Sequence, residues 1–168
     1  MIKMATAAAV SNYILGKLAP GRSLDVVKLQ KLLYFCQGWS LAIYGKPLFP
    51  EDFEAWRRGP VVKEIYKQHR QMYQVPQGFL FGNASCAEDL EGETTSLTEE
   101  ERKVVELVVN DYGSLNTFAL VDLSHIEGGP WSAVHRADGT PAQISKEAIK
   151  AYFDKELARV RRTGQLLP

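Results

Sequence analysis

Cysteine is scarce in this chain of 168 residues, and the two that occur, Cys36 and Cys86, form no C-x-x-C pair. Two cysteines are too few for a disulfide framework, which is typical of a protein kept in a reducing compartment. The densest apolar run, residues 32–36, is far shorter than the ~20 residues that span a bilayer. The first nine residues also lack the apolar segment of a secretory signal. We therefore expect a cytoplasmic protein with no membrane partner.

The chain has no net charge, because 20 Lys and Arg balance 20 Asp and Glu. This balance argues against a protein whose main task is to neutralise phosphates along DNA or RNA. The charges are nevertheless unevenly distributed: residues 57–73 carry +4 and residues 88–111 carry −7. Such segregation can orient a charged partner. The alternative is that both stretches are simply the solvated faces of a helical protein.

Motifs for catalysis or for cofactor binding are missing. His125, Glu127 and His135 are the nearest approach to a metal-ligand cluster, but they match no H-E-x-x-H pattern and have no cysteine partner. Ser124 and His125 are neighbours in a predicted helix and so do not face each other. The chain also has no Walker A loop, no G-x-G-x-x-G and no G-x-S-x-G. We predict a non-enzymatic protein with neither a metal nor a cofactor.

The clearest structural signal is a long helix over residues 24–44. Leu29, Leu32, Leu33 and Cys36 recur at helical spacing. Ser23 is a plausible N-cap, and Gly45 a plausible C-cap. Apolar residues lie on more than one face of this helix, which predicts that it is central in the fold.

Weaker patterns predict the remaining elements. Helices are expected over residues 4–18, 61–73, 99–112, 116–125 and from 146 onward to a frayed end near 159–162, with a further helical turn opening at Pro130. Thr98 and Glu101 form a capping box, and Ser145 is a further N-cap. Residues 53–57 alternate as a strand does, Pro60 would start the helix that follows them, and residues 79–81 could add a second strand paired with 53–57. Residues 88–96 read as an exposed loop.

Together these elements predict a mainly α fold: six to seven helices around a long central helix, with a small two-stranded β element. We expect one domain over residues 1–168, with its core at about 5–155 and a basic C-terminal tail at 159–168.

The most unusual string in the chain is Phe53-Glu54-Ala55-Trp56-Arg57-Arg58-Gly59-Pro60-Val61-Val62. Trp and Arg are favoured at protein–protein hot spots, so a rigid corner bearing them suggests a partner-binding surface. The predicted partner-binding residues are Trp56, Arg57, Arg58, Lys63, Lys67 and Arg70. Two alternatives remain: Trp56 packs inward, or the cations of 57–73 and their neighbouring aromatics bind nucleic acid.

Several short motifs, taken in order, resemble the Panacea domain, the family of SocA-like and GepA-like antitoxins. They are Lys28-Leu29-Gln30-Lys31-Leu32-Leu33-Tyr34-Phe35, Pro47-Leu48-Phe49, Glu54-Ala55-Trp56, Gly59-Pro60-Val61, Leu123-Ser124-His125 and Pro130-Trp131. The family-motif residues taken from them are Lys28, Gln30, Lys31, Tyr34, Glu54, Trp56, Gly59, Pro60, His125, Pro130 and Trp131. The chain departs from the family's pattern at Arg58, where an aromatic residue would be expected.

The resemblance implies a mostly helical antitoxin whose partner is a cognate toxin protein. Members are paired with diverse toxins, often in prophages, and neutralise them by direct protein binding. In one branch the antitoxin is instead an adaptor that delivers its toxin to a ClpXP-type protease. The alternative function, a nucleic-acid-binding module that uses residues 57–73, is the less favoured one.

Overall fold

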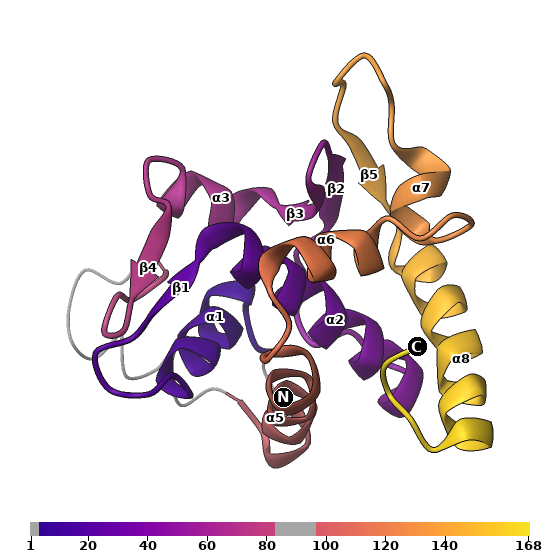
Figure 1. Cartoon of the computed structure of the whole chain (residues 1–168), viewed down its shortest axis with the longest axis horizontal. Coiled ribbons are helices and arrows are strands. Elements are labelled where there is room, and N and C mark those ends of the chain that lie inside the picture. The colour runs from indigo at the N-terminus through magenta and orange to yellow at the C-terminus, as the bar shows by residue number, and fades with distance from the viewer. Residues whose placement is uncertain (1–3, 83–96) are drawn as a thin grey trace.

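The computed structural model describes residues 4–82 and 97–168. The central element is α2 (Val26–Tyr44), which packs against α1 (Ala7–Gly16), α5 (Glu99–Tyr112), α6 (Thr117–Ser124) and α8 (Lys146–Thr163). Figure 1 shows α2 in the middle of the molecule, with α8 along one side and α5 beneath it. The remaining helices are α3 (Lys63–His69) and α7 (Pro130–Val134). The described residues thus contain seven helices, which confirms the predicted mainly α fold around a central helix.

Helix α2 is buried on every side along its middle. Its residues from Leu29 to Leu41 are all buried, including the polar side chains of Gln30, Lys31 and Gln37. At Gly38 helix α8 comes so close that an added Cβ would lie 2.2 Å from the Phe153 ring. The single apolar cluster that surrounds α2 draws on residues from Ala5 to Phe153.

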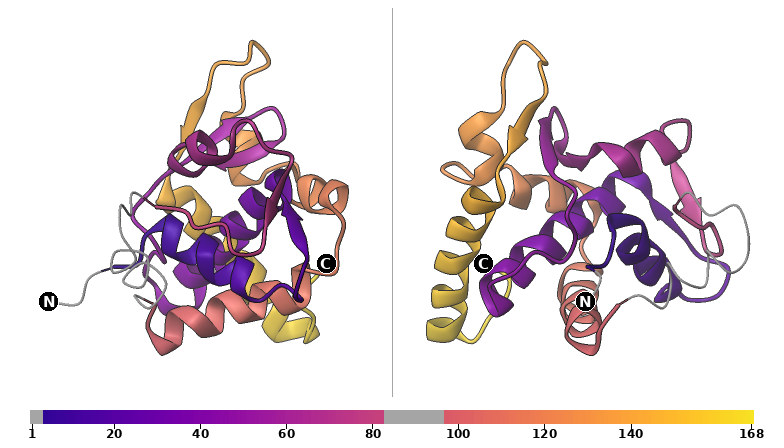
Figure 2. Two further views of the ribbon diagram at one scale, coloured as in Figure 1. Left: turned by 90° about the vertical axis from the view of Figure 1, so that its left-hand side faces the viewer. Right: turned by 180° about the vertical axis from the view of Figure 1, so that it is seen from behind.

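Two small antiparallel sheets complete the fold. One pairs β1 (Ser23–Asp25) with β4 (Gln74–Pro76). The other has the order β3-β2-β5, from β3 (Gly59–Val62), β2 (Phe53–Trp56) and β5 (Ala142–Ile144). The views in Figure 2 show this second sheet at one end of α2, beside α7 and near the start of α8. The sheet content is therefore larger than the two-stranded element predicted.

Most helix ends agree with their predicted capping residues. As predicted, Thr98 and Glu101 form the reciprocal capping box of α5, and Ser145 accepts a backbone N–H bond at the start of α8. Asn116, predicted only as a position at which α6 could begin, is the N-cap of that helix. Gly45 ends α2 in the left-handed conformation, at φ 71°. Pro130 is the first residue of α7, as its ring and fixed φ favour.

Four predictions about the elements are wrong. Ser23 belongs to β1, and Asp25 caps α2 instead, accepting from the backbone N–H groups of Val27 and Lys28. Residues 59–62 form a strand, so Pro60 does not start a helix, and α3 is only seven residues long. Residues 79–81 form no strand; β2 pairs with β3 and β5. Helix α8 continues through 159–162 to Thr163.

The loop predicted at 88–96 lies outside the described residues, as does Cys86. Cys36 is fully buried in α2, and burial raises the pKa of its thiol well above the ordinary value. No helix among residues 4–82 and 97–168 has the length and apolar character needed to cross a membrane.

Candidate functional site

Three stretches of the family motif meet at one end of α2. These are the start of α2, the β2–β3 hairpin and the segment from the end of α6 into α7. The hairpin turns through Arg57 and Arg58, both exposed, between the paired residues Trp56 and Gly59. Figure 1 shows the hairpin above α2, with α6 and α7 beside it.

Gly59 is required both by its backbone and by its neighbours. Its φ is +112°, a conformation that residues with a Cβ rarely adopt. A Cβ at this position would also lie 2.5 Å from Lys31 Cε and 2.8 Å from Ser124 Oγ. The glycine therefore leaves the space through which the Lys31 side chain reaches the hairpin.

Lys31 is a completely buried cation. Its side chain has no exposed surface, and Nζ donates to the Pro60 carbonyl at 2.9 Å. Lys31 has no salt-bridge partner among the described residues. Burial lowers the pKa of Lys31 to about 7, and the negative charge of Asp25 opposes this only in part. A lysine held in this way costs stability, because its charged form is deprived of water.

Gln30 links α2 to both β3 and α3. Its Oε1 accepts from Val62 N at 2.9 Å, and its Nε2 lies 3.3 Å from Val62 O and 2.9 Å from His69 Nε2. Because the amide N–H donates, His69 Nε2 must accept, which places the ring proton on Nδ1. His69 Nδ1 is buried without a hydrogen-bond partner among the described residues. Burial and the nearby Lys31 both lower the pKa of His69.

A stack of three rings supports the hairpin from the α7 side. The Trp131 ring lies between His125, at 3.6 Å and nearly parallel, and His135, at 4.2 Å. Trp131 Nε1 donates to the Trp56 carbonyl at 2.7 Å, which ties α7 to the end of β2. Burial lowers the pKa of His125, and the charge of Lys31 adds to this effect. The two histidines that resembled metal ligands in the sequence are thus ring neighbours of one tryptophan.

A cavity of about 330 Å³ opens between α2, the hairpin and α3. At the wall of this cavity, the Trp56 ring packs edge-on against Tyr66 of α3, with ring centroids 4.6 Å apart. The residues that line the cavity are Val26, Val27, Gln30, Lys31, Trp56, Arg57, Arg58, Val61, Tyr66, His69, Arg70, Met72 and Tyr73. Four of these are Lys or Arg and none is Asp or Glu. The cavity is therefore apolar in much of its lining and has cations as its only formal charges.

The structure brings four of the six predicted partner-binding residues to this cavity: Trp56, Arg57, Arg58 and Arg70. Lys63 and Lys67 are exposed on α3 but do not line it. Lys63 instead borders a second depression of about 390 Å³, whose other charged residues are Glu51, Asp52, Glu54 and Glu64.

The remaining motif residues divide between this site and the scaffold. Lys28 Nζ donates to the carbonyls of Gly113 and Leu115, and so holds the end of α5. Tyr34 is buried among the rings of Phe35, Phe53 and Phe153. Glu54 accepts from Trp56 Nε1 at 2.9 Å.

Several cavity residues were not among the predicted site residues. Tyr73 is 88% exposed and could have been chosen as an aromatic within the basic stretch. Val26, Val27 and Met72 gave no signal, because apolar residues at helix ends look like ordinary core residues. Nothing in the sequence indicated the orientation of His69, whose contact with Gln30 joins residues 39 positions apart.

Comparison with known proteins identifies the family of this chain. Residues 29–132 match the family described as "Antitoxin SocA-like, Panacea domain". The chain is 32% identical over 142 residues to the protein named antitoxin SocA of Caulobacter vibrioides (strain NA1000 / CB15N), an alignment that covers 80% of this chain and 72% of that protein. No solved structure matches the chain. The residues matched to the family include α2 from Leu29 onward, the β2–β3 hairpin and Trp131, and the chain belongs to the SocA-like antitoxin family with a Panacea domain.

Proposed function

We propose that this protein is a cytoplasmic antitoxin that neutralises a cognate toxin by binding it directly through the cavity and its rim. The observation that supports this most is that three family-motif residues, Gln30, Lys31 and Trp56, line one cavity that is bordered by exposed arginines. Arg57, Arg58 and Arg70 are all exposed there, and none has a salt-bridge partner among the described residues.

The rim residues are of the kinds that dominate protein–protein binding energy. Trp, Tyr and Arg are the residues enriched at hot spots, where they fill pockets on a partner or form them. Trp56 is fixed by Glu54, by Tyr66 and, through its carbonyl, by Trp131. A rigid aromatic wall loses little conformational entropy on binding, which favours affinity. The neighbouring cations would speed and orient the approach of an acidic partner surface.

No step of chemistry is needed for this function. Binding a toxin over its active surface excludes its substrate, and the antitoxin's contribution is binding free energy alone. Delivery of the bound toxin to a ClpXP-type protease is a further possibility within the same proposal. The two modes differ in one measurable respect: delivery shortens the lifetime of the toxin in cells with ClpXP and not in cells without it, whereas sequestration leaves that lifetime unchanged.

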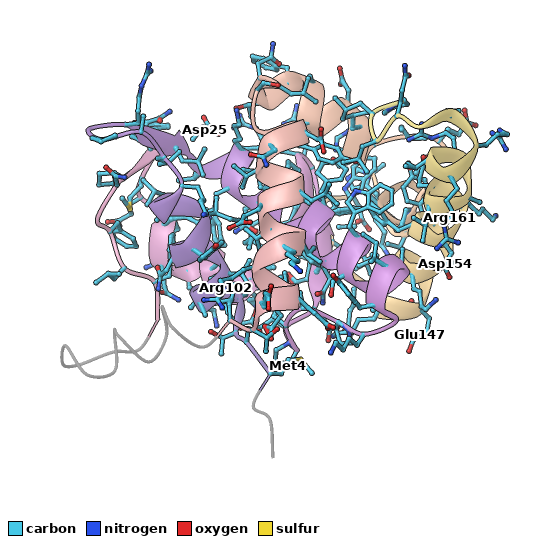
Figure 3. The ribbon with its side chains drawn as sticks, turned by 90° about the horizontal axis from the view of Figure 1, so that it is seen from below. Met4, Asp25, Arg102, Glu147, Asp154 and Arg161 are labelled. Carbon is cyan, nitrogen blue, oxygen red and sulfur yellow. The ribbon has the colours of Figure 1, made fainter. Side chains whose placement is uncertain are left out.

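Growth rescue tests the proposal. The product of the neighbouring gene is expressed with this protein, and the wild type is expected to restore growth. The double variant Arg57→Glu/Arg58→Glu should fail to do so. The matched control is Arg161→Glu/Arg162→Glu, which reverses the same number of exposed arginines on α8. Figure 3 shows Arg161 at the opposite side of the molecule from Asp25, the residue that caps α2 beside the cavity.

The outcomes separate the possibilities. Rescue by the control but not by the hairpin variant supports the proposed surface, provided both proteins give the wild-type circular dichroism spectrum. Equal rescue by all three proteins would show that the hairpin is not the binding surface. Absence of rescue by the wild type would count against this toxin, and against the antitoxin function if no neighbouring gene product proves toxic.

A further inference from the structure

The cavity has a chemical character that narrows what can occupy it. Its apolar walls come from Val26, Val27 and Val61, its aromatic walls from Trp56 and Tyr66. At about 330 Å³ it lies near the lower end of the ~300–1,000 Å³ typical of ligand pockets. That volume accommodates one large apolar side chain and its adjoining backbone, and is too small for the face of a whole helix.

The formal charges that line the cavity are all positive, while the carboxylates of Asp25, beside Lys31, and Glu54, bonded to Trp56 Nε1, lie outside the lining. Arg57 and Arg58 lie in the turn of the β2–β3 hairpin, and Arg70 is the C-cap residue of α3. The three arginines therefore border the cavity from two different elements. Lys31 lies at the base with no exposed surface and adds a cation behind the lining. Charges of one sign that border a cleft with apolar walls raise the local concentration of an anionic partner more than the same charges do on an open surface.

The lining also holds a polar group whose hydrogen-bonding capacity the described residues use only in part. When it is protonated, Lys31 Nζ has three N–H groups, and one of them donates to Pro60 O. His69, only 4% exposed, also lines the cavity, and its Nε2 is bonded to Gln30 Nε2. An anion that enters the cavity can accept from the Lys31 protons that no described residue accepts.

We propose that this cavity binds an acidic peptide segment of the partner protein, in which one aromatic or large aliphatic side chain enters the cavity and flanking carboxylates meet Arg57, Arg58 and Arg70. This proposal rests on the proposed function and names the feature of the toxin that is recognised. Burial of the apolar side chain contributes affinity, and the carboxylates make the cavity prefer this peptide to basic and neutral ones.

An acidic peptide suits the surroundings better than a nucleic acid does. The basic rim is short, because the next depression along the hairpin and α3 is lined by Glu51, Asp52, Glu54 and Glu64. A single strand of nucleic acid would need a continuous basic groove for several phosphates, and its backbone would approach those carboxylates. A short peptide with two to four carboxylates fits within the basic rim.

Three tryptophans give a direct readout of binding. Trp56 lines the cavity, Trp131 is bonded to the Trp56 carbonyl, and Trp39 is buried in the core with its Nε1 donating to Tyr112. The chain has no other tryptophan, so its ¹⁵N-labelled form shows three indole N–H resonances. Peptides with acetylated and amidated ends are titrated into the full chain: GDEFEDG, its neutral analogue GNQFQNG, and GDEAEDG, which lacks the aromatic side chain.

The expected result is a saturable shift of the Trp56 resonance by GDEFEDG, with the Trp39 resonance unmoved. The two control peptides should bind about tenfold more weakly, since each lacks one of the two features recognised. The variant Arg57→Gln/Arg58→Gln/Arg70→Gln should bind GDEFEDG about tenfold more weakly. Each exposed ion pair between an arginine and a peptide carboxylate is expected to contribute up to a few-fold in affinity, and the variant loses all three arginines. Its Trp39 resonance reports whether the core is intact.

Three results would overturn the proposal. One is an unmoved Trp56 resonance at millimolar GDEFEDG, and another is equal binding of GDEFEDG and GNQFQNG. The third is tighter binding of a ten-nucleotide oligothymidylate than of GDEFEDG at the same site, which would favour nucleic acid. Growth rescue together with a negative titration would leave the antitoxin function standing and refute the peptide specificity alone.

Discussion

Replacing the buried Lys31 with methionine is expected to make this protein more stable and less active. Lys31 has no exposed surface, and its Nζ makes one hydrogen bond, to the Pro60 carbonyl. Methionine has a similar length and no charge, so Lys31→Met keeps most of the packing beside Gly59. It removes the cost of burying an ammonium group and leaves the Pro60 carbonyl without its donor.

The magnitude follows from the pKa of Lys31. Burial lowers this pKa from its ordinary 10.5 to about 7. At 1.36 kcal/mol for each pKa unit, the lysine destabilises the folded state by about 4–5 kcal/mol at pH 7 relative to a neutral side chain. Loss of the donor to Pro60 costs about 1–3 kcal/mol. The net expectation is that Lys31→Met raises the free energy of unfolding by about 1–4 kcal/mol at pH 7.

The stability difference between the wild type and Lys31→Met should change with pH in a defined direction. Between pH 7 and 10.5 the unfolded chain keeps the proton of Lys31, whereas the folded protein has released it. Wild-type stability therefore rises with pH in this window relative to the variant, by up to about 1.4 kcal/mol for each pH unit. The advantage of Lys31→Met is largest at pH 7 and below, and it should be smaller by about 3 kcal/mol near pH 9.5.

Urea denaturation of both proteins at pH 7 and pH 9.5, followed by tryptophan fluorescence, measures this difference. A stability difference that is the same at both pH values, or a variant less stable than the wild type at pH 7, would refute the reasoning. Growth rescue supplies the second half of the prediction. If the more stable variant rescues less well, Lys31 is kept for binding at the expense of stability.

Three further substitutions test the packing that positions the site. Gly59→Ala should lower the free energy of unfolding by roughly 1–3 kcal/mol, because alanine is strained at φ +112° and its Cβ would meet Lys31. Thermal unfolding measures this loss, and an unchanged Tm would contradict the close approach of Lys31 to Gly59. Gly38→Ala should also destabilise the protein, since about 1–3 kcal/mol of overpacking against Phe153 exceeds the gain of about 1 kcal/mol in helix propensity. A raised Tm would show that α8 can shift to accommodate the added Cβ at little cost. Thr98→Ala removes the capping box of α5 and should cost about 1 kcal/mol in urea denaturation, whereas Thr98→Ser should cost little.

Local patterns in the sequence were enough to predict most of the helices and several of their caps. The 3.6-residue period marked α2, and the capping residues of α5, α6 and α8 each act over three residues of chain. The strands were less predictable because their partners are distant: Ser23 pairs with Pro76, and Phe53 pairs with Ile144. No local signal shows which of two short extended segments will meet.

The Gly59-Pro60 pair shows how a local rule can mislead. Proline after a break usually starts a helix, and that rule predicted the wrong element here. In the structure Pro60 lies in β3, which is an edge strand of the sheet order β3-β2-β5. Proline is tolerated at such an edge. The positive φ of Gly59 and the approach of Lys31 explain the pair, and both depend on tertiary structure.

The candidate site could be located from the sequence but not built from it. The string from Phe53 to Val62 indicated the hairpin corner, and the family motif indicated Gln30 and Lys31. That Lys31 is buried was not evident, because Lys28 and Lys31 lie three residues apart and resemble a polar helix face. Helix α2 is covered on all sides in its middle, so a cation on that face is enclosed by the hairpin and α6.

The affinity of the purified protein for the purified product of its neighbouring gene tests the proposed function most directly. Isothermal titration calorimetry should show a saturable complex with the wild type and with Arg161→Glu/Arg162→Glu. Binding by Arg57→Glu/Arg58→Glu should be at least about tenfold weaker, corresponding to a loss of about 1.4 kcal/mol. Equal affinity of all three proteins would contradict binding at the hairpin, and no complex with the wild type would contradict direct neutralisation of that toxin.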